Sequence, residues 1–126
     1  FLVKHLRINW KEGEKHFRNC LLDFNEANNV AQWQWVAGCG ADAAPYFRIF
    51  NPILQGEKFD KQGLYVKKWV PELERVPNKF IHKPWEMETK YQEAIKTKIG
   101  SDYPSPIVVH EEARNAALKA FQTLKN

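Results

Sequence analysis

The stretch Asp23–Pro52, DFNEANNVAQWQWVAGCGADAAPYFRIFNP, brings a polar cluster, two tryptophans and an arginine among aromatic residues into one short segment. Within it, Asn25 is a favourable helix N-cap, because its side-chain oxygen can accept a hydrogen bond from a backbone N–H of the first turn. An acidic residue and a run of good helix formers follow it. The pattern therefore predicts a helix over Glu26–Val36.

The predicted helix carries its two tryptophans in different directions. Asn29 and Trp33 are four residues apart and share a face, whereas Trp35 points about 200° away from Trp33. Tryptophans at helical spacing are most often core residues, so periodicity alone favours a packing role for both. The small residues at 38–45 predict a tight loop after the helix, and Asn51-Pro52 is expected to stop or kink the aromatic segment that precedes it.

Helical patterns cover much of the rest of the chain, so the sequence predicts an all-α fold. The last predicted helix, Val109–Leu124, has apolar residues three and four positions apart, which form a stripe along one face. Such a stripe needs a partner surface. Two proline-containing stretches, Glu74–His82 and Ser101–Ser105, are predicted to be surface loops of a single domain. The further predicted helices are Trp10–Leu22, Gly63–Val70, Pro84–Ile99 and Val109–Leu124.

Composition restricts the function only weakly. The formal net charge is +4 and the isoelectric point is near 9.1, which suits nucleic acid binding and many other functions. No apolar run approaches the roughly twenty residues that a membrane span needs, so a soluble, cytoplasmic protein is expected. Cys20 and Cys39 are expected to be reduced and buried, and the histidines have no paired spacing, so no metal site is predicted.

Longer motifs carry a resemblance that periodicity does not reveal. WQWVAG at 33–38 is followed by ADAAPYFRIFNP at 41–52 and QGEKFD at 55–60, and WVPEL at 69–73 and HKPW at 82–85 lie further along. Together they resemble the C-terminal part of the helical FAD-binding domain of DNA photolyases. The resemblance implies that residues 1–126 are the C-terminal portion of a single helical FAD- and DNA-binding domain. This chain is then expected to be a fragment, with the antenna domain, its chromophore and the first part of the helical domain upstream.

The resemblance implies roles for three residues in electron transfer and flavin tuning. Trp33 matches the tryptophan nearest the flavin, and Trp10 matches the middle member of the family's electron-hopping chain, whose outermost member would lie upstream. Asn29 matches the residue that faces the N5 edge of the flavin ring, where an amide can tune the stability of the reduced flavin.

The resemblance also implies a segment that contacts FAD, formed by Asp23, Phe24, Asn25 and Asn29. The family commonly has Asp at the position of Asn25. The asparagine keeps the capacity to cap a helix but removes a negative charge beside the ring. Without the resemblance, helix capping and a solvated polar turn would explain Asn25 and Asn29.

Four further residues match positions that contact damaged DNA. Trp35 matches the aromatic wall of the lesion pocket, and Gln55 matches a residue that contacts the damaged strand. Arg48 and Lys58 resemble phosphate ligands, which orient the DNA backbone without reading its sequence. Ordinary solvated surface charges are the alternative for these two cations. The triplet Trp33-Gln34-Trp35 is similar to that of class I cyclobutane pyrimidine dimer photolyases.

The function implied by the resemblance is light-driven repair of cyclobutane pyrimidine dimers in DNA. In that family reduced FAD absorbs blue light, an electron passes to the dimer, the ring bonds split and the electron returns. The partner would be damaged DNA, the protein would be a monomer, and the chain alone is expected to be inactive. A cryptochrome-like blue-light receptor without repair activity is the closest alternative, and a flavin-free helical DNA-binding module is an alternative of a different class.

Overall fold

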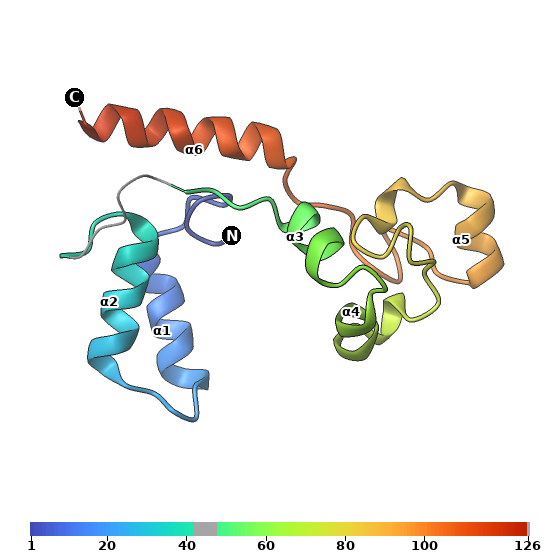
Figure 1. Cartoon of the computed structure of the whole chain (residues 1–126), viewed down its shortest axis with the longest axis horizontal. Helices are drawn as coiled ribbons and strands as arrows, with labels where there is room; N and C mark the ends of the chain where they lie inside the picture. Colours follow the sequence, from blue (N-terminus) through green and yellow to red (C-terminus); the bar gives the residue numbers. More distant parts are fainter. Residues whose placement is uncertain (42–47, 126) are drawn as a thin grey trace. The chain divides into compact units, whose positions relative to one another are not determined.

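The described part of the chain is helical (Figure 1). A computed structural model describes residues 1–41 and 48–125. Within these ranges every regular element is a helix, and the nearest approach to a strand is an isolated bridge between Ile99 and Tyr103. The all-α prediction is confirmed.

The chain divides into two compact units. The first unit comprises Phe1–Ile49 and Val108–Asn126, and the second unit is Phe50–Ile107. The single-domain organisation stays a prediction, and each unit is described by itself.

The first unit is built on two helices that lie side by side, α1 (Trp10–Cys20) and α2 (Glu26–Ala37) (Figure 1). The predicted N-cap of α2 is confirmed, because Asn25 Oδ1 accepts a hydrogen bond of 3.0 Å from the N–H of Asn28. Gly38, with a φ of 77°, ends α2 in the left-handed conformation that glycine adopts without strain. The rest of the predicted loop, residues 42–45, lies outside the described residues, as do residues 46 and 47 of the aromatic segment.

The last helix of the first unit is α6 (His110–Lys125), within one residue of the predicted bounds at each end. Its first residue meets the N-terminal segment, where Nε2 of His5 lies 2.9 Å from Nδ1 of His110. The predicted apolar stripe is only partly covered, since Ala117 is buried whereas Leu124 is exposed.

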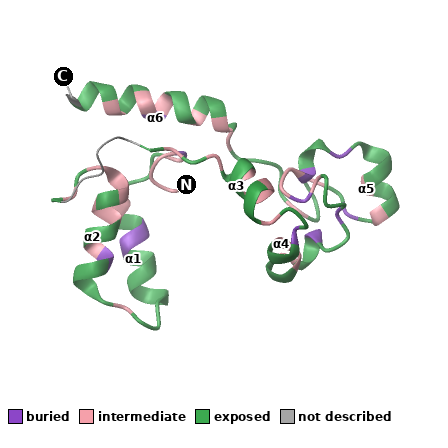
Figure 2. Cartoon of the chain, viewed as in Figure 1, coloured by how far each residue is buried: buried purple, intermediate pink, exposed green. Residues whose placement is uncertain are grey.

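The second unit has a small core of its own. The side chains of Leu73, Val76, Ile81 and Met87 are buried there. Figure 2 shows short buried segments of the ribbon close to α4 and α5. Its regular elements are α3 (Pro52–Phe59), α4 (Leu64–Trp69), the 3-10 turns η1 (Pro71–Leu73) and η2 (Pro84–Glu86), and α5 (Thr89–Ile95).

The prediction that Glu74–His82 is a surface loop is wrong in part. Val76 and Ile81, which belong to this loop, have 0% and 1% of their surface exposed. The helices of this unit are 6 to 8 residues long and cannot enclose a core by themselves. Gly63 illustrates the close packing, because a Cβ there would lie 2.4 Å from Cγ1 of Ile81.

The predicted helix Pro84–Ile99 is also wrong in its extent. The chain forms only a 3-10 turn at its start, becomes extended at Met87, where φ is −68° and ψ is 130°, and resumes as the shorter α5. Burial of Met87 in the core explains the break. The side chain of Gln92 binds the backbone on both sides of α5. Its Nε2 donates to Met87 O at 2.9 Å, and its Oε1 accepts from Ile99 N at 2.9 Å.

Asn51-Pro52 begins a helix instead of only stopping the segment before it. Asn51 is the N-cap of α3, and its Oδ1 accepts from the N–H groups of Ile53 at 3.0 Å and Leu54 at 3.3 Å. Pro52 occupies the first helical position, where its missing N–H costs nothing.

The two cysteines lie at or just after the ends of helices of the first unit. Cys20 and Cys39 are free, as predicted, but both are exposed and not buried. Cys20 is the last residue of α1, and Cys39 follows Gly38, which ends α2. Within the described ranges, no helix combines the length and the apolar character that crossing a membrane would require.

Candidate functional site

A cavity of about 470 Å³ lies beside α1 and α2 in the first unit. The size falls within the range of roughly 300–1,000 Å³ that is typical of small-molecule sites. Aromatic and aliphatic side chains, including Phe17 and Trp33, form much of its wall. The polar residues that line it are Asp23, Asn25, Asn28, Asn29 and Gln32.

The indole of Trp33 is fixed by close packing against α1. A Cβ at Gly13 would lie 2.1 Å from Cη2 of Trp33, so the indole occupies the space that a larger residue would need. The ring of Phe17 contacts the same indole edge-on, with ring centroids 5.1 Å apart and an interplanar angle of 76°. Trp10 shares the face of α1 that carries Gly13 and Phe17, because these positions are three and four residues apart.

The side chain of Asn29 is buried and tied to α1. Its Nδ2 donates hydrogen bonds to the backbone oxygen of Glu14 at 3.0 Å and to Oε1 of the same residue at 3.3 Å. Both partners are acceptors, so the amide nitrogen faces Glu14 and the amide oxygen faces elsewhere. Asn29 is therefore an ordered inter-helix contact and not the solvated polar residue that capping alone would predict.

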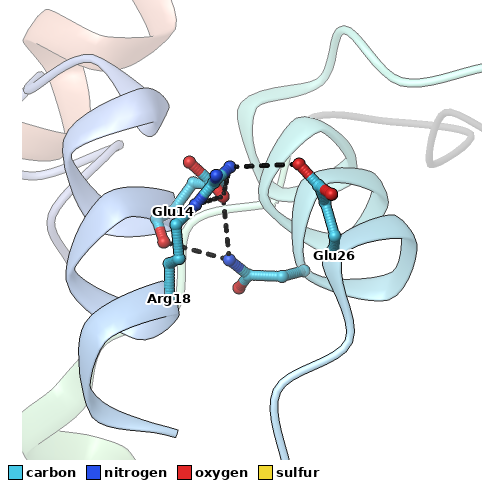
Figure 3. A network of polar contacts seen from close by, with 4 residues as sticks. Glu14, Arg18 and Glu26 are labelled. Carbon is cyan, nitrogen blue, oxygen red and sulfur yellow. Dashed lines mark hydrogen bonds and ion pairs between the residues drawn. The ribbon is translucent and has the colours of Figure 1, made fainter.

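A charged network continues from this contact (Figure 3). Arg18 donates to Oε1 of Glu14 from Nε at 3.1 Å and from Nη2 at 2.7 Å, and the same Nη2 lies 3.4 Å from Oε1 of Glu26. The Glu14 side chain is only 10% exposed, whereas that of Glu26 is 70% exposed. The hydrogen bond and charge of Glu14, with a further contribution from Glu26, raise the pKa of Arg18 above its usual value. Arg18 thus links a buried carboxylate on α1 to an exposed one on α2.

The structure brings most of the predicted flavin residues together. Asp23, Asn25, Asn29 and Trp33 line the same cavity. Phe24 is not among the described lining residues, and its ring lies beneath Arg18, whose Cζ is 5.9 Å from the ring centroid. Their roles towards a flavin stay predictions. In the described part of the chain, no group of three or more His, Cys, Asp or Glu side chains is arranged to hold a metal ion.

The predicted DNA-contacting residues are exposed and belong to both units. Trp35 lies on α2 with 40% of its surface exposed, and Arg48 is exposed in the same unit, where its backbone oxygen accepts from Nζ of Lys4. Gln55 and Lys58 are exposed on α3 in the second unit. Because the residues are divided between the units, the lesion pocket as a whole stays a prediction.

The helix α3 is anchored by the face opposite its exposed residues. A Cβ at Gly56 would lie 2.4 Å from Nδ1 of His82, so the imidazole packs directly on the helix backbone. Nε2 of His82 lies 2.6 Å from the backbone oxygen of Asp60. Nζ of Lys83 lies 2.9 Å from Oε1 of Glu57, and this hydrogen bond and ion pair raise the pKa of Lys83.

Comparison with known proteins places the chain in a family. The family model for the FAD binding domain of DNA photolyase matches residues 1–123. The chain belongs to this photolyase family. The matched range includes both α1 and α2, and therefore the cavity that Asp23, Asn25, Asn29 and Trp33 line.

Individual photolyases are similar over nearly the whole chain. The chain is 55% identical to the deoxyribodipyrimidine photo-lyase of Agrobacterium fabrum and 50% identical to that of Escherichia coli, in each case over 99% of its length. Among solved structures, a bacterial class III photolyase from Agrobacterium tumefaciens matches with a TM-score of 0.91 and 55% identity over 99% of this chain. A Synechocystis cryptochrome matches with a TM-score of 0.87 and 38% identity over 94% of this chain.

The chain covers only part of these photolyases. It spans 26% of the Agrobacterium fabrum protein and 25% of the Escherichia coli protein, or about a quarter of each. It likewise covers 26% of the class III photolyase structure and 24% of the cryptochrome structure. One of these relatives is of class III, so the predicted membership of class I stays a prediction.

Three residues of α1 that hold Trp33 and Asn29, directly or through a neighbour, were not singled out from the sequence. Gly13, Glu14 and Arg18 act on Trp33 and Asn29 from the neighbouring helix. A glycine inside a helical pattern signals close packing, and Glu14 with Arg18 is an acidic and a basic residue at i, i+4. Both signals are present in the sequence, but neither identifies the partner on α2.

Proposed function

We propose that the protein containing this chain is a DNA photolyase that repairs cyclobutane pyrimidine dimers in blue light, and that this chain supplies part of its FAD site. The observation that carries the proposal is the convergence of Asp23, Asn25, Asn29 and Trp33 on one cavity. These are residues for which the family resemblance implies flavin contacts. Membership of the photolyase family supports the same activity for the whole protein.

The lining of the cavity suits the ring system of FAD better than its phosphates. Trp33 and Phe17 offer aromatic surface, and Asn28 and Asn29 carry amides that can donate and accept hydrogen bonds. No Lys or Arg is among the described residues that line the cavity, although cationic side chains commonly bind phosphate groups. We therefore assign the isoalloxazine ring to this cavity and the pyrophosphate to another part of the protein.

The residues of the chain would have distinct tasks towards the cofactor. When bound, reduced FAD supplies the light-absorbing electron donor for splitting the dimer. Asn29 would hydrogen-bond to the polar edge of the ring, and Trp33 with Trp10 would form the path by which an electron reaches the cofactor. Packing of Trp33 against Gly13 would keep that path at a fixed length.

Damaged DNA is the proposed partner. The exposed indole of Trp35 can pack against the linked pyrimidines once they leave the base stack, and Gln55 can contact the damaged strand. Arg48 and Lys58 can neutralise phosphates, which positions the strand independently of its sequence. A monomeric state and a cytoplasmic location are part of the same proposal.

The direct test is an assay of dimer repair. An oligonucleotide with one thymine dimer is incubated with the intact protein and a reductant, in the dark and under blue light, and is then analysed by chromatography. We expect the undamaged oligonucleotide to return only in the light. Trp35→Ala should weaken repair while leaving the bound flavin in place, whereas absence of repair by the unsubstituted protein contradicts the proposal.

A blue-light receptor is the second candidate, supported by the likeness to the Synechocystis cryptochrome. A receptor would use the same cofactor without a lesion pocket. Bound FAD together with no repair in the assay would favour it. Absence of flavin from the purified protein would instead favour a helical DNA-binding module.

A further inference from the structure

Arg18, on α1, is one of the charged residues that connect α1 to α2 (Figure 3). It contributes two hydrogen bonds to one oxygen of Glu14, at 3.1 and 2.7 Å, and an ion pair to Glu26 at 3.4 Å. Neither Arg18 nor Glu14 is among the described residues that line the cavity. A contact of Arg18 with a cavity ligand is therefore not expected, and a geometric influence of Arg18 would pass through another side chain.

The two ion pairs of Arg18 differ in environment. Glu26 is 70% exposed, and an ion pair at such a position contributes little, because water and salt screen it. Glu14 is 10% exposed, and a carboxylate that is removed from water depends on a counter-charge and on hydrogen bonds to offset the lost solvation. The pair with Glu14 is thus the one on which the local structure depends.

Glu14 in turn determines how Asn29 is presented. The backbone oxygen and Oε1 of Glu14 both accept from Nδ2 of Asn29, so the two bonds together fix the plane and the direction of the amide. Asn29 also lines the cavity. Its amide oxygen is the end that remains for a ligand, because the nitrogen is engaged by Glu14.

We propose that Arg18 is a positioning residue for the cavity: its two hydrogen bonds hold Oε1 of Glu14 in place and thereby keep the amide oxygen of Asn29 in place for an N–H group of the ligand. The identity of that ligand as the flavin ring rests on the proposed function. When a residue without a guanidinium replaces Arg18, the buried Glu14 carboxylate loses its counter-charge and both hydrogen bonds to Oε1, and its side chain can move. An Oε1 that has moved no longer accepts from Nδ2 of Asn29, so one of the two bonds that fix the amide is weakened or lost.

The test compares three variants of the intact protein. Arg18→Gln removes the charge, Arg18→Lys keeps a charge without the two-pronged geometry, and Glu26→Gln is the matched control that removes only the exposed ion pair. Two quantities are measured in each: the NMR signals of the side-chain amide of Asn29, in protein labelled with ¹⁵N-asparagine, and the affinity for FAD. The first readout needs no flavin.

We expect the Asn29 amide signals of Arg18→Gln to shift, because Oε1 of Glu14 is no longer held where it accepts from the amide nitrogen. Affinity for FAD should fall about tenfold, which corresponds to the loss of one hydrogen bond. Arg18→Lys should recover most of both properties, and Glu26→Gln should resemble the unsubstituted protein.

Each other outcome contradicts a defined part of the account. Unchanged Asn29 signals in Arg18→Gln overturn the positioning role of Arg18. Shifted signals with unchanged FAD affinity overturn the link from Asn29 to the ligand. An unsubstituted protein without flavin overturns the proposed function, while the amide signals still decide whether Arg18 positions Asn29.

Discussion

Gly13 sets the distance at which α1 and α2 can approach. An added Cβ would meet three atoms of the Trp33 ring at 2.1 to 2.5 Å, which no side-chain rotation of a packed indole can accommodate easily. We expect Gly13→Ala to lower the free energy of unfolding by about 1–3 kcal/mol, even though alanine favours a helix by about 0.5–1 kcal/mol over glycine.

The measurement for Gly13→Ala is denaturant unfolding, with Lys15→Ala as the control. Lys15 is exposed in the same helix, so its substitution should leave stability nearly unchanged. A Gly13→Ala variant as stable as the control would contradict the close packing of Trp33.

Asn25 has two properties that substitution can separate. Its Oδ1 caps α2 through the N–H of Asn28, and its side chain lines the cavity. Asn25→Ala should lower stability by about 1 kcal/mol, because the cap is lost, whereas Asn25→Asp keeps an acceptor and adds a favourable charge at a helix N-terminus. The same added charge should lower the midpoint potential of bound flavin. Spectroelectrochemistry of the two variants checks this, and a potential unaffected by Asp would place the ring away from residue 25.

Residue patterns predicted the cap but not the network on which Asn29 depends. The identity of Asn25 and the spacing of Glu14 and Arg18 are local, so they can be read directly from the sequence. The bond from Asn29 to Glu14 joins residues 15 positions apart and depends on how two helices pack. Local patterns carry no information about that register.

At the scale of elements, the contact between α6 and the N-terminal segment depends on the protonation state of His5. Burial, followed by the Phe1 amino group and His110, lowers the pKa of His5 below its usual value of 6.5. Nδ1 of His5 is buried without a hydrogen-bond partner in the described structure, so a proton there would face no acceptor. The neutral form with Nε2–H donating to His110 therefore suits this environment best.

The sign of the pH effect follows from this shift. Because the folded pKa is lowered, the unfolded chain takes up the proton first, and the stability from His5 is complete above pH 6.5 and is lost as pH falls through the folded pKa. We expect His5→Gln to flatten this part of the stability curve, measured by urea unfolding at several pH values. His16→Gln, at an exposed site on α1, is the control and should not flatten it. Equal curves for both variants would contradict the account.

Elements with strong local signals were predicted best. The helices α2 and α6 have a cap or a clear apolar period, and both are found within one residue of their predicted bounds. The helix predicted over Pro84–Ile99 failed because tertiary burial of Met87 overrides local helix propensity. The loop around Val76 and Ile81 failed for a related reason, since proline and polar residues indicate a turn but do not reveal which neighbouring side chains become core.

At the scale of the whole molecule, the predicted flavin residues are gathered within one unit, whereas the predicted DNA-contacting residues are divided between two. Asp23, Asn25, Asn29 and Trp33 are close in sequence, so one pair of helices is enough to bring them to a common cavity. Trp35 and Gln55 belong to different units, and their joint role depends on parts of a protein of which this chain spans about a quarter. Family resemblance, and not periodicity, predicted both sets.

The central claim is that Trp33 stands beside a flavin held in the cavity of the first unit. The most direct test of this claim is the rate at which light reduces the oxidised flavin of the intact protein. The rate is measured in the unsubstituted protein, in Trp33→Phe and in Trp35→Phe. Phenylalanine preserves much of the packing but is far harder to oxidise than an indole. We predict that Trp33→Phe abolishes this photoreduction, while Trp35→Phe retains it and is impaired in dimer repair instead. Photoreduction at an unchanged rate in Trp33→Phe would contradict the claim.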